Sequence, residues 1–542
     1  MKHLADHLKN YQNLFKVILK EKTQNIPKLG FAFFIWLTLT NMTAFKDAVA
    51  QEISPQSPKP NIVIIISDDH AFQAISAYGN KLIQTPNIDR IANEGVRFDR
   101  AYVTNSICGP SRAVILTGKY SHKNGFKDNV TSTFDHNQDN FAKHLQSAGY
   151  QTAWIGKLHL SGNLQGFSFY NVLPNQGQYY NPEFIGMDGN LIKKEGYVTN
   201  VIEDISEQWL DSRDTSKPFC LIIGHKATHR TWLPDTADMG RYDHMNFPLP
   251  ANFYDDYHNR KAAGLQDMSI NKTMLMSYDL KMLSYNKGEG SIDRMNTAQR
   301  TKFNAYYGPI EADLKAKNLS GKALVEWKYQ RYMKDYYNTA ASLDRNIGRT
   351  LDYLDKHNLS ENTIVIYMSD QGFYLGEHGW FDKRFMYEES FRTPMLMRYP
   401  GVLQAGTQSK ALVMNLDIAP TLLDAANLEV PSAMQGKSML PLFKDKNAKG
   451  RDAMFYHYYE NGEHSVSPHF GLSTKRYKLI RFYTRVSSWE LYDLQKDPSE
   501  ENNIFGKKGY EKITVELKNK LNQLIAQYED EDARKILAED KL

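Results

Sequence analysis

Three short, uninterrupted apolar runs decide what this chain can fold into. They occupy residues 61–66 (NIVIII), 219–223 (FCLII) and 363–368 (TIVIYM). Such runs are typical of strands that are buried on both faces, and these strands belong to parallel sheets. Helical patterns separate them: one begins at Thr85-Pro86 and stops near Gly95, one covers 140–148 before a short strand at 152–155, and a long one covers 327–356. The alternation predicts an α/β domain whose large, mainly parallel sheet lies between helices.

Two regions depart from this alternation. Residues 230–321 are rich in Tyr, Asn and Met without a clean period, which predicts an insertion or lid over one end of the sheet. After about Val430 the pattern alternates at 477–483 and 489–494 and then becomes a polar, helix-forming tail. We therefore expect a main domain over 60–430 and a small α+β subdomain over 431–542.

The first 50 residues have the order of a secretory signal peptide. A basic stretch precedes a 12-residue apolar run at 29–40, and Ala48-Val49-Ala50 supplies an A-x-A cleavage site. The run is shorter than the roughly 20 residues of a spanning helix, so a permanent anchor is the weaker alternative. We expect export to a periplasm or secretion beyond it, with 51–59 as a linker and no stable membrane anchor.

The formal charge of +4 comes from this N-terminal segment. Of the 66 basic and 62 acidic residues in the chain, residues 1–50 hold seven and three, which leaves 59 of each. With no net charge left, capture of a polyanion rests on local placement of charges, and we expect no nucleic-acid partner. The hydrophobic share of 41% excludes a disordered chain.

Polar residues follow three of the predicted strands at their carboxyl ends, as SDDH (67–70), GKLH (156–159) and SDQG (369–372). Ligands bind beyond these ends in an open α/β sheet. Asp68, Asp69 and Asp370, with the amide oxygen of Gln371, are hard oxygen donors of the kind that binds calcium or magnesium. Acidic residues also cap strand ends and helix starts, but the convergence of several strand ends favours the metal site.

The segment CGPSR (108–112) continues through an apolar stretch into TGK (117–119). Taken alone, Cys108 is a thiol at a helix N-terminus, where the dipole lowers its pKa. C-x-P-S-R followed by T-G-K closely resembles the signature of the type I sulfatases, in which this cysteine is oxidised after translation to formylglycine. A strand that ends in Asp-Asp about 40 residues earlier makes the match highly specific.

The resemblance covers nearly all of the chain after residue 50 and implies an alkaline-phosphatase-like fold. It implies one calcium ion, whose ligands are the residues Asp68, Asp69, Cys108, Asp370 and Gln371. It further implies that Arg112 holds the formylglycine hydrate. One departure is Thr228, where many relatives have Pro; it bears on loop shape more than on chemistry.

The expected chemistry follows from the charge of a sulfate ester. Lys119, Lys157 and Lys383 would offset charge on the sulfuryl oxygens. By resemblance, His229 donates a proton to the leaving sugar alkoxide, and His159 deprotonates the second hydroxyl of the hydrate. His122 follows Lys119 by three residues, and helical spacing makes it a neighbour of the same site.

We therefore expect an exported, calcium-dependent sulfatase that acts on sulfated carbohydrate and is matured by a formylglycine-generating enzyme. Two alternatives remain: a formylglycine-dependent phosphoester or phosphonate hydrolase, and a non-catalytic glycan-binding relative. Among weaker candidates, Cys220 is expected in the core, and Glu377-His378 either contacts the sugar or lies in an exposed loop. The aromatic stretch 455–459 is expected to pack in the subdomain rather than stack on a sugar.

Overall fold

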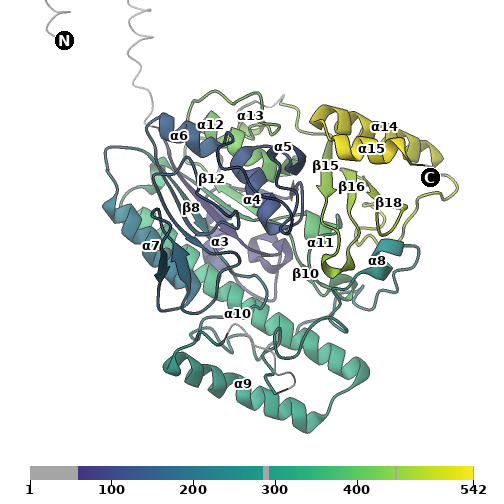
Figure 1. Ribbon diagram of the computed structural model, residues 1–542, viewed down its shortest axis with the longest axis horizontal. Coiled ribbons are helices and arrows are strands. Elements are labelled where there is room, and N and C mark those ends of the chain that lie inside the picture. Colours follow the sequence, from purple (N-terminus) through teal and green to yellow (C-terminus); the bar gives the residue numbers. More distant parts are fainter. Residues whose placement is uncertain (1–58, 285–291, 446–447, 541–542) are drawn as a thin grey trace, which may run out of the picture. The chain divides into compact units, whose positions relative to one another are not determined.

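The computed structural model describes residues 59–284, 292–445 and 448–540 (Figure 1). The predicted signal peptide (1–50) and all but the last residue of the predicted linker (51–59) lie outside the described residues. In the described part of the chain, no helix is both long enough and apolar enough to cross a bilayer.

A ten-stranded sheet carries the predicted apolar runs, in the order β13-β2-β12-β9-β1-β8-β4-β5-β6-β7. The five middle strands, β9 to β5, are mutually parallel, and antiparallel pairs flank them on both sides. The strands are β1 (Asn61–Ser67), β2 (Val96–Phe98), β4 (Gln151–Lys157), β5 (Phe169–Leu173), β6 (Glu183–Ile185), β7 (Leu191–Lys193), β8 (Phe219–Gly224), β9 (Thr363–Ser369), β12 (Met395–Arg398) and β13 (Thr407–Ser409).

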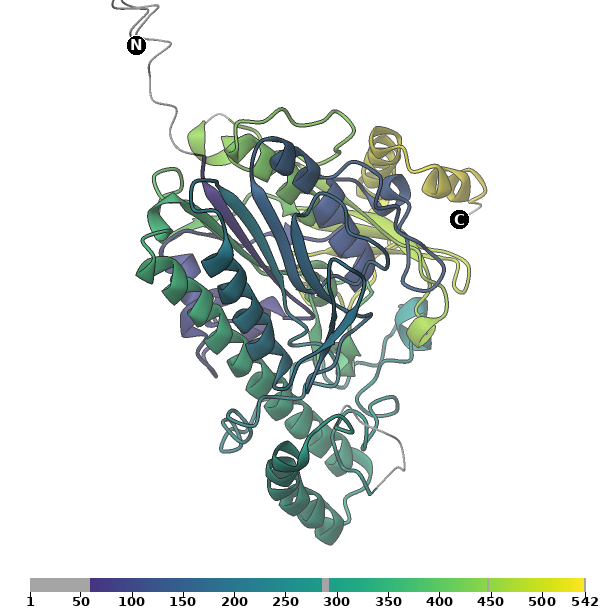
Figure 2. The same cartoon turned by 60° about the vertical axis from the view of Figure 1, so that its left-hand side comes forward.

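Both faces of this sheet are covered by helices, as the uninterrupted apolar runs predict. Along β1, Val63 and Ile65 belong to one core cluster, and Ile62, Ile64 and Ile66 belong to another. The first cluster includes residues of α3 (Pro86–Asn93), α7 (Val198–Ser212) and α10 (Gly321–Lys356), and the second includes residues of α4 (Cys108–Thr117), α6 (Phe141–Ser147) and α12 (Ile418–Ala425). Figure 2 shows the strands between the long helix α10 and the blue helices of the other layer.

The start of α3 is as predicted in position but not in its hydrogen bonds. Thr85 is the N-cap residue and Pro86 opens the helix, yet the Thr85 hydroxyl donates to Asp89 instead of accepting from the helix backbone. Asp344 on α10 accepts the backbone N–H groups of Asn87 and Ile88 in its place. The cap is therefore supplied from a distant helix, which ties α3 to α10.

Within 230–321, the described residues (230–284 and 292–321) include the helices α8 (Lys261–Leu265) and α9 (Thr297–Lys317). Figure 1 shows α9 below the N-terminal part of α10, away from the labelled strands. The sequence pattern did not predict α9, because only Phe303, Tyr307 and Leu314 of its 21 residues are buried. Loops of the same region reach the carboxyl ends of the central strands, where Tyr278 lines a cavity.

The chain after residue 431 forms a four-stranded antiparallel sheet, β15 (Ala453–Tyr458), β16 (His469–Thr474), β17 (Tyr477–Phe482) and β18 (Ser488–Asp493), followed by α14 (Glu511–Tyr528) and α15 (Glu531–Ala538). The apolar side chains of this sheet share a core cluster with Tyr102, Trp380 and Tyr387 of the preceding domain. The small C-terminal α+β region is thus confirmed as a structure, and it packs as a continuation of the main domain.

Short elements complete the described chain. Two two-stranded pairs join β3 (Ala101–Tyr102) to β14 (Val413–Met414) and β10 (Tyr374–Leu375) to β11 (Phe381–Asp382). The short helices are α5 (Ser121–Asn124), α11 (Glu388–Phe391) and α13 (Pro441–Lys444), and the 3-10 turns are η1 (Phe72–Ala74), η2 (Ser76–Tyr78), η3 (Ser360–Asn362), η4 (Glu377–Gly379), η5 (Asn415–Asp417) and η6 (Glu463–Ser465).

Candidate functional site

The carboxyl ends of four adjacent strands meet at one edge of the sheet. Ser67 at the end of β1 pairs with Ser369 at the end of β9, and Gly224 at the end of β8 pairs with Gly156 of β4. The residues that follow these positions are therefore brought together from chain segments that include pairs 301 and 302 residues apart. This edge is where the sequence pattern predicted a ligand site.

Three buried carboxylates form the centre of the site. One oxygen of each of Asp68, Asp69 and Asp370 lies within 4.8 Å of the others, and all three side chains are fully buried. The side-chain nitrogen of Gln371 donates to Asp69 over 2.5 Å. Among the described residues, Oδ1 of Asp68 and Oε1 of Gln371 have no hydrogen-bond donor, although both are buried. Buried oxygens without donors, beside ionisable carboxylates, are the donor set that a hard divalent cation takes.

Three cationic side chains offset this acidic cluster. Lys157 forms a buried ion pair with Asp68, and Lys383 lies 2.8 and 2.7 Å from the two carboxylate oxygens of Asp69. The Nε of Arg112 donates to Asp370 over 3.0 Å. The site thus combines, in one buried volume, the charges that a bound cation and a bound anion would each need.

The carboxyl groups titrate differently because their neighbours differ. Burial and, after it, the nearby Asp68 carboxylate raise the pKa of Asp370 to about 7 against the opposing charge of Arg112. Burial likewise raises the pKa of Asp69 to about 6, with Lys383 opposing. For Asp68, burial also acts to raise the pKa, but Lys157, His229 and Arg112 together outweigh it and hold the pKa well below its usual range.

Cys108 is the first residue of α4 and points toward this cluster. Its side chain is buried, and its Sγ lies 3.8 Å from the Gln371 side-chain nitrogen. Burial raises the pKa of the thiol to about 12, although the helix N-terminus alone predicts a lowered value. Gly109 is required beside it, since a Cβ there would lie 2.6 Å from the Phe126 ring. As an unmodified thiol, Cys108 is therefore a poor nucleophile.

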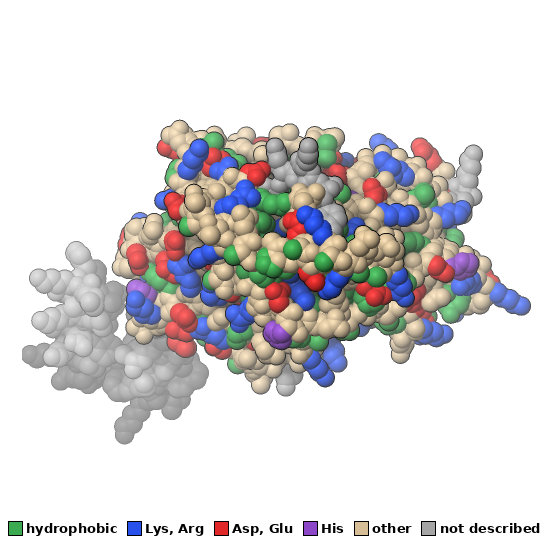
Figure 3. Space-filling model, turned by 90° about the horizontal axis from the view of Figure 1, so that it is seen from below, with side chains coloured by type: hydrophobic (Ala, Val, Ile, Leu, Met, Phe, Trp, Pro, Cys, Tyr) green, Lys and Arg blue, Asp and Glu red, His purple; other side chains and the backbone are tan. Residues whose placement is uncertain are grey.

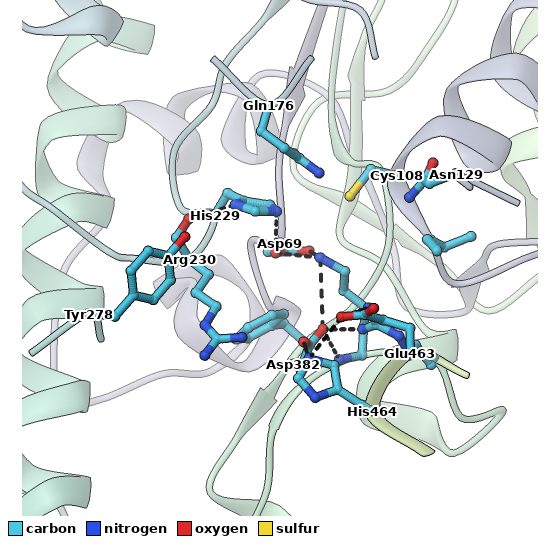
Figure 4. A pocket seen from close by; sticks show the side chains of 14 residues that line it. Asp69, Cys108, Asn129, Gln176, His229, Arg230, Tyr278, Asp382, Glu463 and His464 are labelled. Carbon is cyan, nitrogen blue, oxygen red and sulfur yellow. Dashed lines mark hydrogen bonds and ion pairs between the residues drawn. The ribbon is translucent and has the colours of Figure 1, made fainter. Parts of the chain in front are cut away.

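His229 and His159 both lie close enough to the cluster for the charge of Asp68 to influence their pKa values. The Nδ1 of His229 lies 2.7 Å from the Arg230 carbonyl oxygen, which can only accept, so Nδ1 carries the proton and Nε2 faces Asp69 at 3.9 Å (Figure 4). Burial lowers the pKa of His229 well below its usual value, with Asp68 opposing and Lys157 adding to the shift. Burial lowers the pKa of His159 in the same way, and its Nδ1 has no partner among the described residues.

Lys383 is held between two residues with unusual backbones. Asp382 has a φ of 87° and Arg384 a φ of 95°, which lie in a backbone region that residues other than glycine rarely adopt. The two side chains are paired, with Arg384 Nη1 2.6 Å from Asp382 Oδ1. Such strained backbone conformations, held in place by side-chain contacts, are common where a functional side chain must be kept in one orientation.

The structure does not bring two of the predicted site residues, Lys119 and His122, to the site. Lys119 follows the C-terminus of α4, and the ten residues of that helix span about 15 Å at 1.5 Å per residue, so it lies a helix length from Cys108. His122 binds the C-terminal region instead: its Nε2 lies 2.8 Å from the Tyr528 carbonyl oxygen and its Nδ1 lies 3.1 Å from the Tyr459 hydroxyl. Neither residue lines the cavity beside Cys108.

The weaker candidates are also placed. Cys220 is fully buried in the core, as expected. His378 is not exposed and does not line the cavity beside Cys108; it is fully buried, with its Nδ1 2.6 Å from Asp255 Oδ2. Tyr456 and Tyr458 are fully buried on β15, so the aromatic stretch packs in the subdomain.

A cavity of about 200 Å³ opens beside Cys108, and most of its wall was not predicted. Figure 4 shows Arg230 and Tyr278 on one side, with Asp382 and His464 below Asp69. The polar lining residues that sequence reasoning missed are Asn129, Gln176, Arg230, Tyr278, Asp382, Arg384, Glu463 and His464. Asp382 and Arg384 flank the predicted Lys383 and Arg230 follows the predicted His229, whereas the others lie in loops that carry no periodic signal.

Comparison with known proteins matches the chain to two family models. The sulfatase family matches residues 60–428, and the family described as N-sulphoglucosamine sulphohydrolase, C-terminal, matches residues 376–527. The chain is 49% identical over 493 residues to an N-acetylglucosamine-6-O-sulfatase of Bacteroides thetaiotaomicron, with 88% of each chain covered.

Solved structures agree with the fold. A protein in complex with its substrate D-glucosamine-2-N,6-O-disulfate superimposes with a TM-score of 0.85 at 48% identity, covering 88% of this chain and 99% of that one. A phosphonate monoester hydrolase of Agrobacterium radiobacter shares the fold at 20% identity, with a TM-score of 0.65 over 86% of this chain and 96% of that one. The predicted alkaline-phosphatase-like fold, with its C-terminal antiparallel sheet, is confirmed.

Proposed function

Because this chain belongs to the sulfatase family and is a sulfuric ester hydrolase, we propose that it removes the 6-O-sulfate group from a glucosamine residue of a sulfated carbohydrate. Two comparisons support this substrate: the match to the N-acetylglucosamine-6-O-sulfatase at 49% identity, and the match at 48% identity to a structure whose substrate carries sulfate on N2 and O6. The proposal thus specifies, for the predicted sulfated carbohydrate, which sugar carries the hydrolysed sulfate and at which position.

One observation carries the catalytic proposal, namely that Cys108 lies beside three buried carboxylates and three buried cations at a single sheet edge. We propose that Cys108 is matured to formylglycine and that Asp68, Asp69, Asp370 and Gln371, with position 108, hold one calcium ion. Formylglycine supplies a hydrated aldehyde as the nucleophile, and calcium supplies positive charge at the sulfuryl oxygens. The all-oxygen donor set and its unpaired buried oxygens fit calcium.

The remaining residues bind charge and move protons. With the carboxylates held by a cation, the ammonium groups of Lys157 and Lys383 can bind sulfuryl oxygens, and Arg112 fixes Asp370. The Nε2 of His229 donates a proton to the leaving sugar oxygen; a bound sulfate ester adds negative charge beside it, which raises its pKa toward the working range. His159 accepts the proton that must leave position 108 as sulfate is released.

The outer wall of the cavity suits a sugar. The paired Asp382 and Arg384, together with His464, whose Nε2 lies 2.8 Å from Asp382, offer donors and acceptors that can bind hydroxyl groups. A volume of about 200 Å³ lies below the range typical of drug-sized ligands, about 300–1,000 Å³, so it accommodates one sugar ring rather than a chain. We therefore propose action on a terminal residue.

Maturation and export complete the proposal. Cys108 is 1% exposed, so a formylglycine-generating enzyme must reach it before the chain folds. A chain that is exported through a signal peptide at 1–50 passes through such an unfolded state. We propose a periplasmic or secreted protein, and N-terminal sequencing of the mature form should begin near Gln51.

A panel of sulfated glucosamines tests the substrate. Purified matured protein should release sulfate from N-acetylglucosamine 6-sulfate and leave the 3-sulfate isomer intact, as measured by ion chromatography. Aryl sulfate should be hydrolysed far faster than aryl phosphate. Preference for the phosphate would favour the phosphoester hydrolase alternative, and release of no sulfate from any 6-O-sulfated sugar would contradict the substrate.

A further inference from the structure

Arg230 forms a second cationic position in the cavity, apart from the lysines of the sulfate site. It follows His229 in the loop after β8 and lines the same cavity (Figure 4). Its carbonyl oxygen holds the His229 ring, while its side chain extends to the wall made by the insertion. The proposed catalysis gives this guanidinium no role.

The insertion fixes Arg230 in one orientation. Asp279 binds Nε over 2.6 Å and Nη2 over 3.0 Å, and the Asp279 side chain is fully buried. The guanidinium carbon lies 5.3 Å from the centre of the Tyr278 ring and 5.1 Å from that of the Phe381 ring. An arginine that is clamped along one edge and packed against two rings loses little side-chain entropy when it binds a ligand.

The opposite edge of Arg230 is left for a ligand. Its Nη1 makes no hydrogen bond or ion pair within the described ranges 59–284, 292–445 and 448–540, and 21% of its side chain is exposed. The other charged groups at this wall are not free to bind an anion, because Arg384 is paired with Asp382, and Glu463 is itself an acid. Arg230 is thus the cation of this wall that can accept an anion without first breaking a pair.

We propose that Arg230 binds a second anionic group of the substrate, a sulfo or carboxylate group in addition to the sulfate ester that is hydrolysed. This inference rests on the proposed action on 6-O-sulfated glucosamine. On such a sugar the second anion is either an N-sulfo group on C2 of the same ring or the carboxylate of a neighbouring uronic acid. Guanidinium groups recognise both by charge-assisted hydrogen bonds. Asp279 acts as a positioning residue for Arg230.

The experiment compares kcat/KM for three substrates: N-acetylglucosamine 6-sulfate, N-sulfoglucosamine 6-sulfate, and a disaccharide whose terminal N-acetylglucosamine 6-sulfate is linked to a uronic acid. Wild-type enzyme should prefer at least one of the two doubly anionic substrates. Arg230→Gln should reduce that preference about 10- to 100-fold, which corresponds to about 1.4 to 2.8 kcal/mol. The substrate whose advantage disappears identifies the source of the anion.

Matched variants separate this role from a structural one. Arg230→Gln alone leaves the buried Asp279 carboxylate without its partner, so the double variant Arg230→Gln/Asp279→Asn removes both charges and should lose the same preference. Arg241→Gln changes an arginine of the same insertion that does not line the cavity, and it should keep the wild-type preference.

Three results would overturn the inference. Equal kcat/KM of the wild type for all three substrates would remove the need for a second anion site. An equal loss on all three substrates in both Arg230 variants would mean that Arg230 only supports the fold or the shared sugar site. Failure of the wild type to hydrolyse any of the three would overturn the proposed function together with this inference, whereas the first two results leave the proposed function standing.

Discussion

Calcium should stabilise this protein far more at pH 8 than at pH 5, because its proposed ligands hold protons at the lower pH. Burial raises the pKa of Asp370 to about 7, whereas an aspartate in an unfolded chain titrates near 3.8. Without a cation, the folded state therefore binds this proton more tightly than the unfolded state does. Its contribution to stability is complete below about pH 4 and is lost as the pH rises through about 7.

The size of the effect follows from the shift. The rise of the Asp370 pKa from 3.8 to about 7 lowers the free energy of unfolding by about 4 kcal/mol between pH 4 and pH 8. A chain unit that covers residues 60–542 has an unfolding entropy of about 1 kcal/mol per kelvin, so the melting temperature falls by about 4 °C. Asp69, whose pKa is raised to about 6 by burial, shifts the result in the same direction.

Calcium reverses this loss where the carboxylates are ionised. At a concentration 100 times its Kd at pH 8, it stabilises the fold by about 2.7 kcal/mol, or about 3 °C. At pH 5 only about 1% of a carboxyl group with a pKa of 7 is ionised, which raises the apparent Kd for calcium about 100-fold. The same calcium concentration is then near the Kd and stabilises the fold by only about 0.4 kcal/mol.

Differential scanning fluorimetry with calcium and with chelator, from pH 5 to pH 8, measures both effects. Asp370→Asn should flatten the pH dependence and weaken the calcium response. Asp344→Asn is the matched control: burial also raises the pKa of Asp344 to about 6, but it lies on α10 and binds the start of α3. An equal calcium shift at pH 5 and pH 8, or an unchanged calcium response in Asp370→Asn, would refute the reasoning.

Three further predictions concern single side chains. His229→Ala should reduce kcat on a sugar sulfate by about 100-fold or more but affect an aryl sulfate with an acidic leaving group far less, because only the sugar alkoxide needs the proton; equal losses in a stopped assay would exclude a proton donor. Lys119→Met should leave kcat/KM unchanged, since Lys119 lies a helix length from Cys108; a loss of tenfold or more would restore it to the sulfate site. Arg451→Met should lower the free energy of unfolding by about 3–5 kcal/mol in a denaturant titration, because it leaves the buried Asp417 without its cation, and a change below 1 kcal/mol would contradict this.

The sheet and the centre of the site were predictable because a strong physical constraint limits which residue types can occur at these positions. Strands that are covered on both faces must be apolar at every position, so β1, β8 and β9 were visible within a residue of their ends. The carboxyl ends of parallel strands lie at the same edge of a sheet, so the polar residues that directly follow them lie close together. This is why Asp68 and Asp370 could be predicted to share one site.

The outer site was not predictable, because its residues come from loops that meet only in three dimensions. Tyr278 and His464 reach the cavity from segments without a period. The prediction for Lys119 is wrong for a different reason: Lys119 belongs to the same sequence motif as Cys108, but a rigid helix of ten residues separates the two in space. His122 was expected on the same face, but it packs against the C-terminal helix region.

The most direct test is sulfate release from N-acetylglucosamine 6-sulfate by protein produced with a formylglycine-generating enzyme, with position 108 examined by mass spectrometry on the same sample. Wild-type protein should carry formylglycine at position 108 and release sulfate in proportion to the modified fraction. Cys108→Ala should melt within a few degrees of the wild type and release none. Substantial sulfate release by Cys108→Ala, or by wild-type protein whose Cys108 is unmodified, would contradict the account.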